Sequence, residues 1–190
     1  MKPTRLPLTR VALAIALAAC GAQESEELAD AGAGPDSDSP FARQFVAAHD
    51  QVRASVEPAP QPALPPLQWN AEAARVAQAW ADRCDYRHNP NNGQLGENLA
   101  AAAPPSDEPP SWAVELWASE AADYDYATNS CAPNQVCGHY TQLVWRDTTS
   151  VGCATRICST GSPFGGSFPT WQLWVCNYDP PGNWVGERPY

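Results

Sequence analysis

The sequence lacks most of the patterns that mark common enzyme classes. Its 190 residues include only 3 His and 1 Met. Neither the Gly-x-Ser-x-Gly of serine hydrolases nor the His-Glu-x-x-His of zinc proteases occurs. There is no Cys-x-x-Cys pair, which disfavours a zinc site built from thiolates. Internal repeats are absent as well, so no standard catalytic or repeat signature suggests a function.

Positive charge is scarce. The chain has 11 Lys and Arg against 21 Asp and Glu, a formal net charge of −10. Because an acidic surface repels phosphate backbones, nucleic acid is excluded as a partner. Three of the basic residues, Lys2, Arg5 and Arg10, precede an apolar run at 11–19. That run is too short to span a bilayer and is typical of a targeting segment.

The targeting segment ends in Leu-Ala-Ala-Cys-Gly at 17–21. This resembles a bacterial lipobox, in which the cysteine is lipidated, so we predict a signal peptide at 1–19 and lipidation of Cys20. An ordinary secretory signal cut nearby is the alternative. Residues 20–38 are rich in Ala, Gly, Asp, Glu and Ser and are expected to form a flexible acidic tether. The protein is then exported, and is either lipid-anchored to a bacterial membrane or cell surface or secreted.

Seven cysteines are an odd number for an exported protein. If Cys20 carries lipid, six remain, which suits three disulfides in an oxidising compartment. They are Cys84, Cys131, Cys137, Cys153, Cys158 and Cys176. Their spacing leaves most of the pairing open. The exception is a hairpin between the β-prone runs at 151–157 and 171–178, which would bring Cys153 and Cys176 together.

Three helices are predicted in a domain at 39–190. Ser39 before Pro40 starts the first, and an apolar face follows it, on which His49 is expected to be a buried structural residue. Asn70 caps the second. Ser111 caps the third, whose Trp112, Leu116 and Glu120 share a face, so Glu120 points inward. After the strands, the tail at 182–190 is irregular, with Trp184 and Val185 as its anchors.

Three segments resemble signatures of one superfamily. They are Gly-Glu-Asn-Leu at 96–99, Cys-Gly-His-Tyr-Thr-Gln-Leu-Val-Trp at 137–145 and Cys-Asn-Tyr-Asp-Pro-Pro-Gly-Asn-Trp at 176–184. Together they resemble the CAP superfamily of cysteine-rich secretory, antigen 5 and pathogenesis-related class 1 proteins. The resemblance covers roughly 41–190 and is nearest to the plant class 1 branch. It implies an α+β fold, a three-layer α-β-α sandwich. The disulfides that it implies are Cys84–Cys158, Cys131–Cys137 and Cys153–Cys176.

The resemblance also implies a cavity lined by His88, Glu97, Glu120 and His139. Two imidazoles and two carboxylates can bind a divalent cation, zinc before others. They can instead perform acid–base chemistry, or simply hydrogen-bond one another within the core. We therefore expect an extracytoplasmic binding protein whose partner is a lipid, a glycan or a protein.

Two other functions stay open. The same residues suit a metal-assisted hydrolase with Glu97 or Glu120 as general base. A structural surface protein or a lipid- or sterol-binding module is the remaining alternative. Lipid binding would require several aromatic side chains that are exposed together. The candidates are Trp112, Trp117, Tyr124 and Tyr126. Aromatic side chains more often belong to the core.

Overall fold

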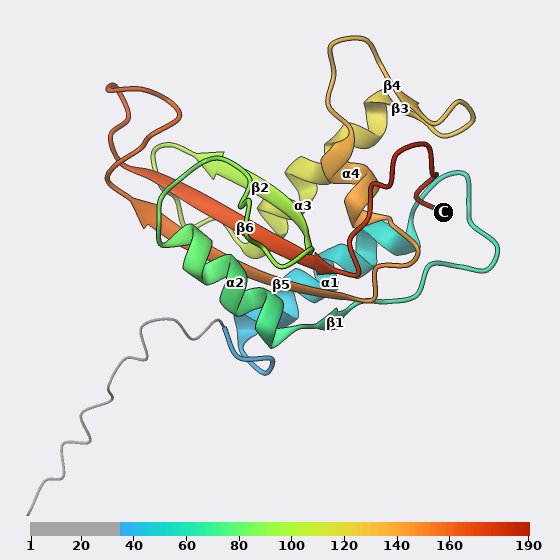
Figure 1. Cartoon of the computed structure of the whole chain (residues 1–190), viewed down its shortest axis with the longest axis horizontal. Helices are drawn as coiled ribbons and strands as arrows, with labels where there is room; N and C mark the ends of the chain where they lie inside the picture. The colour runs from blue at the N-terminus through green and yellow to red at the C-terminus, as the bar shows by residue number, and fades with distance from the viewer. Residues whose placement is uncertain (1–34) are drawn as a thin grey trace, which may run out of the picture. The chain divides into compact units, whose positions relative to one another are not determined.

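The computed structural model describes residues 35–190 (Figure 1). The predicted signal peptide, Cys20 and most of the tether lie outside this range. The helices are α1 (Pro40–Ala54), α2 (Ala71–Ala81), α3 (Pro110–Ala118), the 3-10 helix η1 (Ser119–Asp123) and α4 (Gly138–Leu143). The strands are β1 (Gln68–Trp69), β2 (Gly96–Ala102), β3 (Tyr124–Asp125), β4 (Ser130–Cys131), β5 (Ser150–Cys158) and β6 (Trp171–Asp179). None of the described helices is long and apolar enough to cross a membrane.

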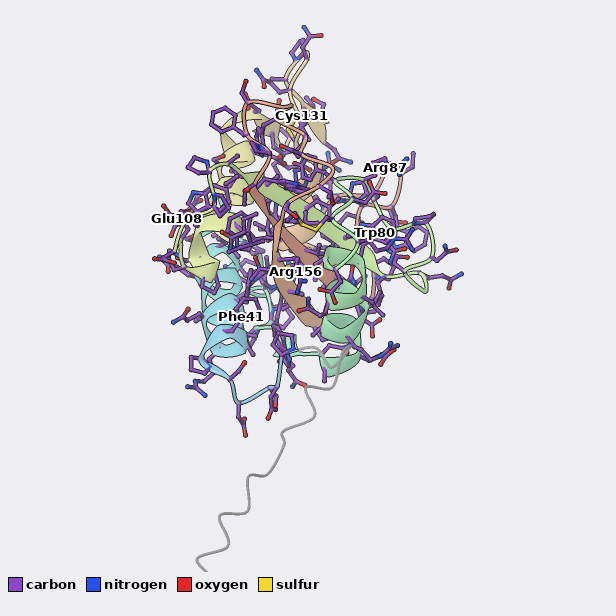
Figure 2. All side chains as sticks on the ribbon, turned by 90° about the vertical axis from the view of Figure 1, so that its left-hand side faces the viewer. Phe41, Trp80, Arg87, Glu108, Cys131 and Arg156 are labelled. Atoms are coloured by element: carbon purple, nitrogen blue, oxygen red, sulfur yellow. A yellow bond between two sulfur atoms is a disulfide. The ribbon has the colours of Figure 1, made fainter. Side chains whose placement is uncertain are left out.

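One mixed sheet organises the molecule, with strand order β1-β5-β6-β2. The β5–β6 and β2–β6 pairs are antiparallel and the β1–β5 pair is parallel. Figure 2 shows helices on both sides of it: Phe41 of α1 lies on one side, Trp80 of α2 on the other, and Arg156 of β5 between them. The predicted three-layer α-β-α sandwich is therefore confirmed.

Alternation along β6 builds two cores, one on each face of the sheet. Trp174, Cys176 and Tyr178 belong to the core beneath α1, α3 and α4. Trp171, Leu173 and Val175 belong to the core beneath α2. All six are buried. Residues 35–190 thus contain the whole sheet and both cores, and they also contain three disulfides, so this unit has what it needs to fold by itself.

The first two helices begin where the sequence predicts. The Ser39 side chain accepts a hydrogen bond from Ala42 N at 3.1 Å, and Asn70 caps α2 in the same way at 3.0 Å from Ala73 N. Gly152 of β5 lets α2 lie very close to the sheet. A Cβ atom at this position would stand 2.1 Å from Ala74 N, a clash with the backbone.

The third helix differs from its prediction. It begins at Pro110, and Ser111 is not its cap, because a proline supplies the fixed φ of the first helical position without a side-chain bond. Leu116, expected on the inner face, is 45% exposed, and Trp117 is buried instead. The chain then tightens into η1 at Ser119. This 3-10 turn, rather than a regular helical stripe, sets the direction of Glu120.

All three expected disulfides are present: Cys84–Cys158, Cys131–Cys137 and Cys153–Cys176. Cys153 and Cys176 face each other across the β5–β6 pair, as the hairpin predicted. Besides the third helix, two further features of the fold were not predicted correctly. Strand β2 was not recognised, and Trp184 and Val185 do not anchor the tail, because they are 58% and 103% exposed.

Arg53 connects α1 to the segment that follows α4. Its side chain is buried and donates to four backbone carbonyls: Pro65 O at 2.9 Å, Leu143 O at 2.9 Å, Trp145 O at 2.8 Å and Thr148 O at 3.4 Å. Burial lowers the pKa of Arg53 to about 10, so the guanidinium stays charged at neutral pH. It therefore satisfies the carbonyls of Leu143, Trp145 and Thr148 in buried hydrogen bonds.

Replacing Arg53 with Met should destabilise the fold by at least about 3 kcal/mol, because several buried carbonyls lose their donor. Urea unfolding of both proteins measures the difference. Arg43→Met is the matched control, since Arg43 lies exposed on the same helix, and it should change stability by less than about 0.5 kcal/mol. Equal effects of the two substitutions would contradict the role assigned to Arg53.

Candidate functional site: two histidine–glutamate pairs

The Glu120 carboxylate holds His139 at the start of α4. Its Oε1 accepts from His139 Nδ1 at 2.6 Å, and its Oε2 accepts from the backbone N–H groups of His139 at 2.9 Å and Tyr140 at 3.1 Å. A carboxylate suits this position because the first N–H groups of a helix have no internal partner. The Trp117 ring stacks on the imidazole, with centroids 6.3 Å apart. Because an ionised carboxylate only accepts, Nδ1 carries a proton, and Nε2 is the nitrogen with a lone pair in the neutral imidazole.

A second pair, formed by His88 in the loop before β2 and Glu97 in β2, repeats this arrangement. Glu97 Oε1 accepts from His88 Nδ1 at 2.8 Å and from Asn89 N at 2.9 Å. The Glu97 side chain is only 3% exposed, whereas His88 is 67% exposed. The hydrogen bond to Glu97 raises the pKa of His88. The other oxygen of this carboxylate, Oε2, is buried and has no partner among the described residues.

Asn98 joins the two pairs. It follows Glu97 in β2, and its Nδ2 donates to His139 O at 3.1 Å and to the Tyr178 hydroxyl at 3.1 Å. The Tyr178 hydroxyl in turn donates to His49 Nε2 at 3.0 Å, and His49 Nδ1 donates to Phe45 O at 2.7 Å. A buried chain of hydrogen bonds therefore runs from α1 through β6 and β2 to His139 in the first turn of α4.

His49 is a structural residue, as predicted. It is fully buried, and both ring nitrogens have partners. Burial lowers its pKa to about 4, and the nearby Arg53 charge adds to this effect. Its neutral form is thus built into the fold. The roles of Asn98 and Tyr178 in this chain of hydrogen bonds were not predicted from the sequence. Each is a polar side chain within an otherwise apolar segment, which was a signal for such a role.

The four expected site residues form two pairs rather than one four-ligand set. Within residues 35–190, no group of three or more His, Cys, Asp or Glu side chains converges as a metal centre would require. Each glutamate is engaged by a histidine and by backbone N–H groups. The glutamates therefore orient the imidazoles. Nε2 of each imidazole remains available for other contacts.

His88 opens onto a pocket of about 250 Å³ between α2 and the loop before β2. Trp80, Arg83, Asp85 and Arg87 are among its walls. The aromatic group considered for lipid binding is not exposed together. Trp117 is buried, and Trp112 and Tyr124 pack against the core as partly buried residues. Tyr126 stacks on Tyr190, with centroids 4.6 Å apart.

Comparison with known proteins agrees with this fold. The pattern described as "Cysteine-rich secretory protein family" (CAP) matches residues 46–178. The chain therefore belongs to the CAP family. Membership of a secretory family, together with the three disulfides, indicates an exported protein.

Relatives occur in plants and in mammals. Pathogenesis-related leaf protein 4 of Solanum lycopersicum is 40% identical over 148 residues, which cover 78% of this chain and 82% of the relative. Peptidase inhibitor 16 of Mus musculus is 41% identical over 146 residues, or 77% of this chain. The match spans only 28% of that mouse protein.

Solved structures share the fold. Venom allergen-like protein 4 of Schistosoma mansoni superposes with a TM-score of 0.60 at 32% identity, covering 80% of this chain and 94% of that one. NaASP2, crystallised with Zn²⁺, gives a TM-score of 0.64 at 23% identity, covering 84% of this chain and 90% of the other.

Glu120→Gln should change the tautomer of His139. The oxygen of a glutamine side chain can still accept from the backbone N–H groups of His139 and Tyr140. In that orientation its NH₂ group faces Nδ1 of His139 and acts as a donor. We therefore expect Nδ1 to become the acceptor and the ring proton to move to Nε2. Imidazole ¹⁵N chemical shifts at neutral pH report the change. Glu115→Gln, at an exposed position on α3, is the control and should leave the tautomer unaltered. An unchanged His139 spectrum in Glu120→Gln would contradict the assignment.

His49 should make the fold sensitive to acid. The unfolded chain takes up a proton near pH 6.5, whereas the folded chain resists it down to about pH 4. Stability is therefore retained above the unfolded pKa and falls as pH drops through this window, by up to about 3 kcal/mol. Urea unfolding of wild type and His49→Gln at several pH values measures how the free energy of unfolding depends on pH. The variant should lose the decrease that wild type shows between pH 6.5 and about pH 4.

His88→Gln provides the contrast for this measurement. Because the pKa of His88 is raised, its ion pair contributes at low pH and its contribution is lost as pH rises through the folded pKa. That variant should keep the acid-side loss of stability. If His49→Gln retained the same slope as wild type, another group would be responsible.

Proposed function

We propose that this CAP domain is an extracytoplasmic binding module that holds a divalent cation, zinc first, through Nε2 of His88 and Nε2 of His139. One observation carries the proposal: both histidines give Nδ1 to a glutamate, at 2.8 and 2.6 Å. Carboxylate–histidine pairs of this kind orient metal-binding imidazoles and raise their basicity. Glu97 and Glu120 are thus orienting residues rather than the principal ligands.

The donor set fits a zinc ion. Neutral imidazole nitrogens are preferred zinc ligands, and the buried Glu97 Oε2, which has no described partner, offers an oxygen beside His88. Asn98 links the two pairs through the backbone, since it follows Glu97 and donates to His139 O. An ion held by so few protein groups would keep open positions for water or a bound molecule. Affinity should fall in acid, because the ring nitrogen of His88 must be free of its proton.

A metal-assisted hydrolase is the second candidate. Its general base would be Glu97, because both oxygens of Glu120 are already occupied by N–H donors. Glu97 Oε2 is the only carboxylate oxygen of the two pairs without a partner in the described residues. Its burial restricts access to a substrate, so binding is the better supported function.

Calorimetric titration of zinc into residues 35–190 tests the binding module. Wild type should bind zinc stoichiometrically, and His88→Ala/His139→Ala should lose binding while staying folded by circular dichroism. Asn91→Ala is the matched control, because Asn91 lies exposed in the same loop as His88. NaASP2 was crystallised with Zn²⁺, so zinc is the first ion to titrate. A folded wild type that binds no zinc would sink the proposal and leave the pairs as a structural network.

We further propose that the protein is a bacterial lipoprotein, with lipid on Cys20 and a tether up to residue 38. The lipobox-like sequence at 17–21 supports this location. Mass spectrometry of the membrane fraction would detect a lipidated Cys20, and Cys20→Ala should release the protein. The bound partner would be a lipid, a glycan or another protein outside the cytoplasm.

A further inference from the structure

The connection between β5 and β6, residues 159–170, is named here the tip loop. Figure 1 shows this connection projecting from the hairpin beyond α2. It contains no charged residue, and nearly all of it is exposed. Phe164 and Phe168 are each 44% exposed, and Ile157 at the base of the loop is 60% exposed. Apolar side chains gathered at an uncharged tip are unusual on a protein surface and indicate contact with an apolar environment.

Three arginines lie near the base of this loop. The Arg83 guanidinium lies 5.0 Å from the centroid of the Trp80 ring and has no acidic partner among the described ion pairs. Arg87 and Arg156 also lie here, each beside a single aspartate, Asp85 and Asp82. In Figure 2, which views the molecule from the tip, Arg87 and Trp80 lie to one side of the hairpin that carries Arg156. Three arginines against two aspartates leave this end with a local excess of one positive charge, on a chain whose net charge is −10.

The tip is rigidly attached to the arginine-bearing segment. The Cys84–Cys158 disulfide joins the residue after Arg83 to the last residue of β5. Gly161 lies against Cys84 O, where a Cβ would stand 2.6 Å away. Tyr86, 41% exposed, packs edge-on against Trp171, with centroids 6.4 Å apart. The apolar tip and the cationic base therefore form one fixed surface.

We propose that this end of the molecule docks on a lipid bilayer that carries anionic headgroups, with Phe164 and Phe168 inserted at headgroup depth. Exposed aromatic side chains next to arginines are the combination by which peripheral proteins bind such surfaces. The uncharged loop enters without the cost of burying a charge, and the arginines meet the lipid phosphates. The interaction uses neither histidine–glutamate pair and requires no lipid on Cys20, although Arg83 and Arg87 also line the pocket onto which His88 opens.

Co-sedimentation of residues 35–190 with vesicles tests the proposal. One set of vesicles is phosphatidylcholine alone and the other is phosphatidylcholine mixed with phosphatidylglycerol. We expect binding to the mixed vesicles, weakened by added salt because the electrostatic part is screened. Phe164→Ser/Phe168→Ser should weaken it by roughly tenfold or more. Arg83→Ser should weaken binding to the mixed vesicles only.

Trp184→Ser/Val185→Ser is the matched control, since it removes an exposed apolar pair from the C-terminal tail. It should leave vesicle binding unchanged. The proposal is overturned if mixed vesicles bind no better than neutral ones, or if the control weakens binding as much as the phenylalanine variant. It is also overturned if light scattering shows that the phenylalanines mediate self-association and the protein does not bind to either set of vesicles.

Discussion

A buried guanidinium fixes the part of the fold on which the site depends. Arg53 donates to Leu143 O and Trp145 O, just where α4 ends, and so connects this short helix to α1. α4 has only 6 residues, too few to be stable without tertiary contacts. Arg53 satisfies carbonyls at its end and Glu120 satisfies N–H groups at its start. His139 thus belongs to a short helix that is held by interactions at both of its ends.

Polar contacts also connect the site to the sheet and to α1. A single Asn98 side chain contacts both the backbone of His139 and the hydroxyl of Tyr178, which is bonded to His49. Buried networks whose members are all satisfied specify one arrangement of the core, because any other packing leaves a polar group without a partner. The two histidine–glutamate pairs therefore rest on a framework that continues into α1.

Much of this architecture follows from local rules in the sequence. Caps at Ser39 and Asn70, and alternation in the strand runs around Cys153 and Cys176, predicted two helices and the hairpin. Strand β2 escaped prediction because its run of small alanines has low β-propensity and is held by pairing with β6. The identities of the site residues were implied by family resemblance. Their division into two pairs depends on which side chains meet in space, and spacing alone does not encode that.

Each histidine of the site lies close to a disulfide. His139 follows Cys137 by two residues, and Cys137 closes the small loop with Cys131. His88 lies four residues after Cys84, whose partner Cys158 ends β5. The segments that carry both histidines are therefore braced by covalent bonds that only an oxidising compartment supplies. A copy of the chain in a reducing compartment would lack both constraints.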